Sequence, residues 1–177
     1  MQYTAHYESP LGGLLLAADD VGLTGLWFDG EKYYALHLAR EHEMRQTAVH
    51  EQTAAWLDVY FSGREPDFMP PLHLIGTPFQ QEVWALLRQI PYGKTTTYGA
   101  LAKTLAAQRG LERVSAQAVG GAVGHNEISI LVPCHRVVGT GGSLTGYAGG
   151  VDKKKALLEL EGVSMEGLFV PKRGTAL

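Results

Sequence analysis

The chain contains a single cysteine, Cys134, which lies in an apolar run and is followed directly by His135 and Arg136. A thiolate is a strong nucleophile, and it forms readily beside a cation or a hydrogen-bonding base, so both neighbours are of types that activate a cysteine. A lone cysteine is nevertheless more often a small buried apolar side chain than a nucleophile. The surrounding residues must therefore decide between catalysis and packing.

Adjacent side chains do not face each other on a regular helix or strand. Cys134 and His135 can cooperate only around a tight turn or through a water molecule, and Pro133 favours such a turn. A catalytic histidine is usually oriented by a carboxylate. Glu161 is a candidate, because it lies in the last turn of the final predicted helix, where the helix dipole disfavours an anion. A solvated surface glutamate is the competing interpretation.

The composition bounds the class of protein. With 177 residues, of which 45% are hydrophobic, the chain is predicted to be globular and to hold one or two small domains. No apolar run has the length of a membrane span, and the N-terminal residues show no secretion signal. One cysteine cannot form an internal disulfide or a cysteine-rich zinc site, so we expect no metal and a reducing, cytoplasmic setting.

Charge is divided unevenly along the chain. Residues 1–76 carry 4 lysines and arginines against 11 aspartates and glutamates, a net of −7, whereas residues 77–177 carry 11 against 7, a net of +4. Such asymmetry favours a second half that meets an anion such as nucleic acid. Chance placement of surface charge explains the same numbers equally well.

The first half predicts an antiparallel strand meander followed by a helix. Short apolar runs separated by turn residues fill the first thirty positions, and a helix is expected near Val49–Phe61. Three prolines between residues 66 and 71 then indicate a linker. We therefore predict an N-terminal domain over residues 1–75 and a C-terminal domain over residues 76–177.

The second half predicts helices. Thr77, Pro78 and Gln80 form a capping-box pattern for a first helix that ends before Pro91. A second helix is expected from Thr97 to Ala107, and a third from Ser115 to Val123. The third contains several glycines, which permit close approach either of another helix or of a nucleic-acid backbone. The second and third helices together resemble a helix-turn-helix.

A glycine-rich stretch follows Cys134. Residues 139–150 lack the lysine and hydroxyl ending of a phosphate-binding loop, so nucleotide hydrolysis is rejected, and either a hairpin or a mobile wall over a pocket is expected. Asp152 is predicted to cap a last helix that buries Ala156, Leu157 and Leu160 and ends at Gly162. The predicted fold is thus α/β (α+β), with an N-terminal antiparallel sheet and a mostly helical C-terminal domain.

Six segments of the second half resemble motifs of a known family, and they occur in the same order as in that family. They read T-P-F-Q-Q-E-V-W, I-P-Y-G-K-T-T-T-Y-G, A-V-G-G-A-V-G-H-N, I-L-V-P-C-H-R-V-V-G, G-Y-A-G-G and L-L-E-L-E-G. They are similar to the motifs of the O6-alkylguanine-DNA alkyltransferases over about residues 77–163. One such motif is weak, but six in register are highly specific. The first 75 residues are less diagnostic.

The resemblance implies a role for each motif residue. Cys134 would accept the alkyl group from the guanine O6 of an extruded base. His135 would take the cysteine's proton through a water molecule, and Glu161 would orient His135. Tyr98 would help rotate the nucleotide and donate toward the base. Asn126 would be the hinge between recognition helix and active site.

The resemblance also implies residues that contact the base and the DNA. Those expected at the guanine pocket are Tyr147, Ala148, Gly149, Val137 and Lys154. Those expected to bind DNA, with the recognition helix in the minor groove, are Gln117, Ala118, Gly121, Ala122 and Arg136. The expected partner is double-stranded DNA carrying O6-alkylguanine, without a cofactor or a membrane. We expect a monomer in solution and a single turnover, and leave open O4-alkylthymine as a substrate and cooperative assembly on DNA.

The sequence departs from the family pattern at several places. Gln117 stands where the family usually has an arginine that enters the base stack, which predicts weaker DNA affinity or slower extrusion. Glu127 replaces a common proline and is expected to loosen the turn after Asn126. The segment 106–114 is longer than in many relatives, so Arg109 or Arg113 could compensate at the phosphate backbone.

Three other functions remain open at this point. A lesion-binding protein of the alkyltransferase-like type would lack the cysteine that this chain keeps. A Cys-His hydrolase or acyl transferase would need an oxyanion hole and would turn over repeatedly. A plain helix-turn-helix regulator would hold Cys134 only for packing. Salt-dependent DNA binding and alkyl transfer distinguish among them.

Overall fold

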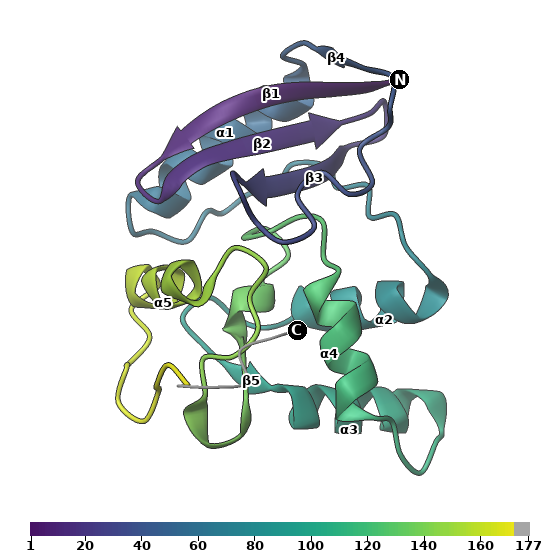
Figure 1. Ribbon diagram of the computed structural model, residues 1–177, viewed down its shortest axis with the longest axis vertical. Coiled ribbons are helices and arrows are strands. Elements are labelled where there is room, and N and C mark those ends of the chain that lie inside the picture. Colours follow the sequence, from purple (N-terminus) through teal and green to yellow (C-terminus); the bar gives the residue numbers. More distant parts are fainter. Residues whose placement is uncertain (172–177) are drawn as a thin grey trace. The chain divides into compact units, whose positions relative to one another are not determined.

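The computed structural model describes residues 1–171, and the chain forms two compact units (Figure 1). The first unit comprises residues 1–75 together with residues 127–129. The second comprises residues 76–126 and the chain from residue 130 onward. The division at residue 75 coincides with the expected linker, but no sequence pattern pointed to residues 127–129 as part of the first unit.

The first unit is built on a four-stranded sheet in the order β3-β2-β1-β4. β1 (Gln2–Ser9), β2 (Gly12–Ala18) and β3 (Leu23–Phe28) form the predicted antiparallel meander. β4 (His42–Met44) pairs parallel to β1 and was not predicted, because its three residues are all exposed and carry no alternating pattern.

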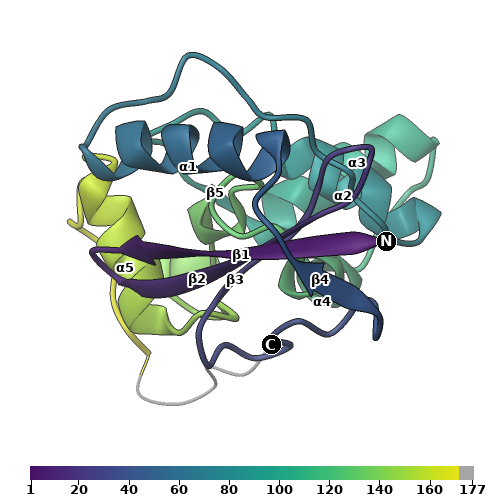
Figure 2. The same cartoon turned by 90° about the horizontal axis from the view of Figure 1, so that it is seen from above.

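One helix, α1 (Ala48–Phe61), packs on this sheet, as the view from above shows (Figure 2). Its buried positions include Leu57 and Tyr60, which are fully inaccessible to solvent. The opposite face of the sheet holds a smaller apolar cluster of Leu15, Ala17 and Trp27. Ala35 and Leu38, from the segment after β3, pack against that cluster and cover it.

The second unit contains the predicted helices. α2 (Pro78–Leu87) begins at Thr77, whose hydroxyl accepts from the backbone N–H of Gln80, so the capping box is present. α3 (Tyr98–Arg109) runs two residues further than predicted and stops where Gly110 adopts a φ of 65°. α4 (Ala116–Gly124) is capped by Ser115. α3 and α4 pack together as the predicted helix-turn-helix.

Of the two alternatives for the glycine-rich stretch, the hairpin is absent and the wall of a pocket is present, and the start of the last helix differs from the prediction. Residues 139–150 form no hairpin; they contain a short 3-10 turn at Thr140–Gly142, and Ser143 then bridges to Phe169. α5 (Val151–Leu160) starts after Gly150, so Asp152 lies inside its first turn and is not the cap.

The buried face of α5 also differs. It consists of Lys154, Leu157 and Leu158, whereas Ala156 and Leu160 are only partly buried. Tertiary packing selects a face one position away from the predicted stripe, with a lysine in its centre. Two short strands, β5 (Thr96–Thr97) and β6 (Val137–Val138), pair in parallel and bring the start of α3 beside the segment that follows Cys134.

Candidate active site

Cys134 lies in a tight turn of the type expected from Pro133. Residues Cys134–Arg136 form a single 3-10 turn, so the side chains of Cys134 and His135 are not held on opposite faces as they would be in a strand. The thiol is 7% exposed. The Nδ2 group of Asn126 donates to Cys134 Sγ at 3.4 Å and to the carbonyl of Val132 at 2.9 Å. An N–H aimed at sulfur favours the thiolate over the thiol.

Glu161 is the carboxylate that orients His135. It follows α5 as its C-terminal cap, its side chain is inaccessible to solvent, and its Oε2 lies 2.5 Å from His135 Nε2. Its Oε1 accepts from Arg136 Nε at 2.8 Å and from the backbone N–H of Gly93 at 3.0 Å. The interpretation of Glu161 as a solvated surface residue is therefore wrong.

These contacts set the charges of the buried pair. Burial alone would raise the pKa of Glu161, but its hydrogen bonds and charge interactions with His135 and Arg136 lower that pKa to about 2. Burial lowers the pKa of His135, which is inaccessible to solvent, against the opposing effect of Glu161. The site thus pairs an ionised Glu161 and Arg136 with a neutral imidazole that is ready to accept a proton.

The ring nitrogen of His135 that is not paired with Glu161 is Nδ1. Because Nε2 bonds to Glu161, the neutral ring carries its hydrogen there and leaves Nδ1 as the base. Nδ1 is buried and has no hydrogen-bond partner within the described residues 1–171. The ring of Tyr147 meets the imidazole edge-on at a centroid distance of 6.4 Å, which limits the ring's freedom to rotate.

Lys154 supports the loop after Cys134 and does not point into open space. Its buried Nζ donates to the carbonyl of Val137 at 2.5 Å and to that of Thr145 at 2.8 Å. Burial lowers the pKa of Lys154 to about 8, partly opposed by the charge of Cys134. Lys154 was predicted to lie beside the pocket. Its hydrogen bonds instead hold together two segments of the chain behind the pocket wall.

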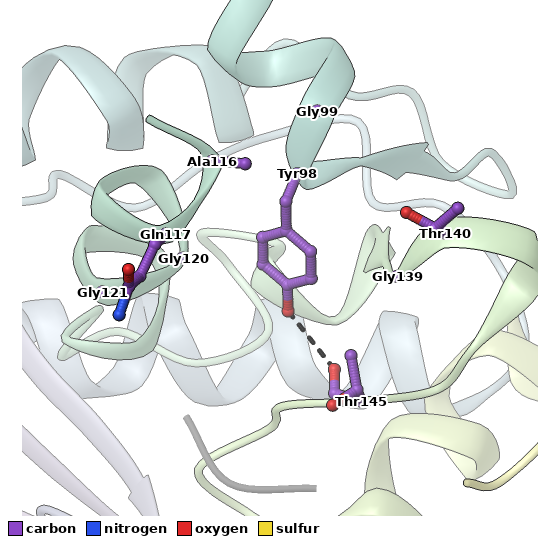
Figure 3. A pocket seen from close by; sticks show the side chains of 9 residues that line it. All are labelled: Tyr98, Gly99, Ala116, Gln117, Gly120, Gly121, Gly139, Thr140 and Thr145. Carbon is purple, nitrogen blue, oxygen red and sulfur yellow. Dashed lines mark hydrogen bonds between the residues drawn. The ribbon is translucent and has the colours of Figure 1, made fainter. Parts of the chain in front are cut away.

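A cavity of about 610 Å³ opens between α4 and the glycine-rich stretch. Figure 3 shows the ring of Tyr98 between the α4 residues on one side and Thr140 and Thr145 on the other. The Tyr98 hydroxyl donates to the carbonyls of Thr145 and Gly146 at 3.3 and 3.4 Å. Burial raises the pKa of this hydroxyl, so it remains a donor at neutral pH.

The lining of this cavity only partly matches the predicted site. It consists of Tyr98, Gly99, Ala116, Gln117, Gly120, Gly121, Gly139, Thr140 and Thr145. The predicted wall residues Tyr147, Ala148 and Gly149 are not among them, and Val137 is fully buried behind the loop.

Two predicted DNA contacts do not lie on the surface. On α4, Gln117, Ala118 and Gly121 are exposed, but Ala122 is 4% exposed and its carbonyl accepts from the indole N–H of Trp84 at 2.9 Å. Arg136 is 8% exposed and donates to Glu161 and to the carbonyl of Ile90. Ala122 therefore packs α4 onto the unit, and Arg136 holds the carboxylate of the site.

Sequence reasoning missed the role of the segment before β5. Gly93 N–H and the Ile90 carbonyl hold Glu161 and Arg136, and Tyr92 lies beneath the guanidinium of Arg136 with 5.7 Å between its ring centroid and the guanidinium carbon. The quoted motif I-P-Y-G contained these residues, but their partners lie more than forty residues away.

Within residues 1–171, no group of three potential metal ligands comes together, and no helix combines the length and apolar character that a bilayer crossing requires. A buried thiol, a neutral imidazole paired with a carboxylate, and a helix-turn-helix in the same unit define the class of protein as one with a cysteine nucleophile beside a DNA-binding fold.

Comparison with known proteins identifies the family. Residues 2–74 match the ribonuclease-like domain of 6-O-methylguanine DNA methyltransferase, and residues 78–163 match the DNA binding domain of the same family. A methylated-DNA–protein-cysteine methyltransferase of Mycobacterium tuberculosis is 43% identical over 159 residues, which cover 88% of this chain and 92% of the relative. The Methanosarcina acetivorans counterpart is 41% identical over 161 residues, covering 90% and 98%.

A solved structure agrees with this assignment. The crystal structure of Mycobacterium tuberculosis OGT in complex with DNA superimposes with a TM-score of 0.77 at 42% identity, covering 90% of this chain and 92% of that one. The chain belongs to the 6-O-methylguanine DNA methyltransferase family.

Proposed function

We propose that this protein repairs DNA by moving the alkyl group of O6-alkylguanine onto Cys134, stoichiometrically and irreversibly. The observation that carries the proposal is the buried arrangement in which Asn126 donates to Cys134 Sγ while Glu161 fixes His135. Family membership supports the reaction class. Each residue role below is part of the proposal.

The residues suit displacement at a saturated carbon. His135 Nδ1 takes the thiol proton through a bridging water, and the sulfur then bonds to the alkyl carbon as the carbon–O6 bond breaks. The electron pair of that bond stays on the guanine, which takes up the proton that the thiol released and remains in the DNA as an unmodified base. The Tyr98 hydroxyl is a donor placed at the cavity and stabilises the charge that develops on the base.

The cavity suits a base that has left the stack. The O6 of guanine cannot reach a protein thiol inside a duplex, so the nucleotide must be extruded. The exposed Gln117, Ala118 and Gly121 of α4 would contact the minor groove, where sequence is read poorly and damage in any context can be found. The mycobacterial relative solved in complex with DNA supports DNA as the partner.

The proposal includes a single turnover and a reducing compartment. The chain has one cysteine, so no second thiol can remove the alkyl group from the thioether. A buried free thiol suits the cytoplasm, where it stays reduced. We further propose a monomer that acts on double-stranded DNA.

Mass spectrometry of the intact protein and its peptides, after incubation with a duplex carrying one O6-methylguanine, tests the proposal. A gain of one methyl group per molecule on the Cys134 peptide, absent in Cys134→Ser, is the expected result. Tight lesion binding without a mass gain would instead leave a lesion sensor. Repeated release of a product would identify a turnover enzyme.

A further inference from the structure

The outer edge of β3 is extended by a segment from far along the chain, residues 127–129. The N–H of Leu26 donates to the carbonyl of Glu127 at 2.8 Å, and the N–H of Ser129 donates to the carbonyl of Leu26 at 3.1 Å. Ile128 and Leu26 form a parallel bridge. These three residues belong to the first unit, although Asn126 and Ile130 on either side belong to the second.

The carboxylate of Glu127 anchors this segment in the sheet. The side chain is 8% exposed, and its Oε2 accepts from the indole N–H of Trp27, a residue that is 3% exposed, at 2.7 Å. Its Oε1 lies 2.8 Å from Nδ1 of His37. A buried carboxylate is retained only where its oxygens are paired, and both oxygens have partners here. The turn after Asn126 is thus held, and the expectation that Glu127 loosens it is not supported.

The other end of the same loop touches the reacting sulfur. Asn126 Nδ2 closes the loop by donating to the Val132 carbonyl and reaches Cys134 Sγ. Between the two ends, Ile130 has a φ of 72° and is 1% exposed. A β-branched residue in the left-handed region is strained and persists only where its flanks are fixed. Loop 126–132 is therefore closed by the hydrogen bond from Asn126 to Val132, and its start is held on the sheet by Glu127.

We infer that Glu127 is a positioning residue for alkyl transfer, which fixes the Asn126 amide against Cys134 Sγ by tethering the start of loop 126–132 to Trp27 and His37. The inference rests on the proposed function, because alkyl transfer is one of its two readouts. Glu127 itself touches neither the sulfur nor the cavity lining. Its effect reaches the thiol through the backbone between residues 126 and 129.

The first readout is single-turnover transfer from a duplex carrying one O6-methylguanine. Displacement of a reacting group by about 1 Å costs on the order of 100-fold in rate, so Glu127→Ala is expected to lower the transfer rate constant at saturating DNA by about 10- to 100-fold. The dissociation constant for the same duplex is expected to stay within about twofold, because α4 is unchanged. Glu43→Ala, an exposed carboxylate in the same sheet, is the matched control.

The second readout needs no DNA. Cys134 is the only thiol, so alkylation by iodoacetamide, followed against pH, reports its pKa alone. Loss of the Asn126 donor disfavours the thiolate, so Glu127→Ala is expected to move the pH midpoint of alkylation upward. Glu127→Gln, which keeps an oxygen acceptor for Trp27, is expected to restore part of both readouts. A role confined to stability would leave the midpoint unchanged.

The two readouts separate the two proposals. A shifted midpoint in a chain that transfers no alkyl group would support the tether and contradict the proposed function. Normal rate and normal midpoint in folded Glu127→Ala would overturn the tether. If that variant does not fold, Trp27→Phe and His37→Ala each remove one partner of the carboxylate, and normal readouts in both would likewise overturn the inference.

Discussion

Oε2 of Glu161 lies 2.5 Å from Nε2 of His135, and neither side chain is accessible to solvent. The same carboxylate takes a second charged partner, Arg136, through its other oxygen. One acid therefore does two things: it orients the imidazole and it neutralises a buried guanidinium. These two roles can be separated by mutation.

Glu161→Gln is expected to reduce the alkyl transfer rate constant by about 100-fold or more, because the imidazole loses the partner that fixes its tautomer. It is also expected to destabilise the fold by about 3–5 kcal/mol, because Arg136 is left buried without a counter-charge. Urea unfolding and single-turnover transfer measure the two effects. The double variant Glu161→Gln, Arg136→Met should regain stability but not rate; recovery of both would contradict separate roles.

Stability is expected to fall as the pH drops below about 6.5, the ordinary histidine value. Burial lowers the pKa of His50 as well as that of His135, so both stay neutral when folded and bind protons when unfolded. The lowered pKa of Glu161 affects stability in a more acidic range. Its contribution is present above its ordinary pKa of 4.5 and is lost as the pH falls toward about 2. A loss of stability between pH 7.5 and 5.5 is therefore expected to come from His50 and His135 and not from Glu161.

Urea unfolding at pH 7.5 and 5.5 measures this dependence. His50 accepts from the N–H of Thr47 through Nδ1, and its Nε2 lies 3.1 Å from the Tyr3 carbonyl, so the neutral ring satisfies both contacts. His50→Gln should therefore weaken the pH dependence while lowering stability at both pH values. His42→Gln, on an exposed strand, should leave the dependence unchanged. Equal slopes in all three proteins would contradict the assignment.

Gly121→Ala is expected to separate stability from DNA binding. An added Cβ would meet no heavy atom within 4 Å, and alanine is favoured over glycine inside a helix by about 1 kcal/mol. The melting temperature should therefore rise. The same methyl group would keep a DNA backbone away from α4, so affinity for duplex DNA should fall. Unchanged affinity would show that close approach at Gly121 is not required.

Gln117→Arg is expected to tighten DNA binding and speed transfer, because a longer cationic side chain would stand at the exposed edge of the cavity. If the arginine meets a phosphate, the slope of log affinity against log salt should steepen by about 0.9. Gln117→Glu keeps the shape of the glutamine side chain but adds a negative charge, so it should weaken binding to DNA. Identical affinities in the three proteins would remove position 117 from the DNA interface.

Arg109 is a weak candidate for compensating the glutamine at position 117. Its Nε donates to Glu82 at 2.7 Å, and its guanidinium carbon lies 5.3 Å from the centroid of the Phe79 ring. The Arg109 side chain therefore already contacts two residues of α2 from its position at the end of α3. Arg113 lies at the mouth of a second groove between α3 and α4 and is the better candidate of the two.

Local signals in the sequence were reliable where the structure is local. The capping box at Thr77, the stop at Gly110 and the turn after Pro133 each depend on a few neighbouring residues, and each is present. The position of Glu161 at the end of the last helix made it a candidate partner of His135, the six motifs added the family resemblance, and the structure pairs the two residues. Helix ends and caps were less certain, as Asp152 shows.

What the sequence did not reveal depends on distant partners. The family resemblance implied that Arg136 contacts DNA, but its side chain is buried and donates to Glu161 and to the Ile90 carbonyl. Lys154 is buried for the same reason, by two backbone carbonyls that no helical pattern predicts. The strand contributed by residues 127–129 is the most distant case, since its partner is Leu26.

That added strand has a consequence for synthesis. A chain made from its N-terminus presents β1, β2 and β3 early, and residues 71–73 then pair with the edge of β3 at Leu23, but the edge at Leu26 stays open until Glu127–Ser129 have been made. Cleavage of the gene product at the linker near residue 76 would therefore yield an N-terminal fragment with an incomplete sheet and a buried indole lacking its acceptor. The first unit therefore cannot be completed until α2, α3 and α4 of the second unit have been made.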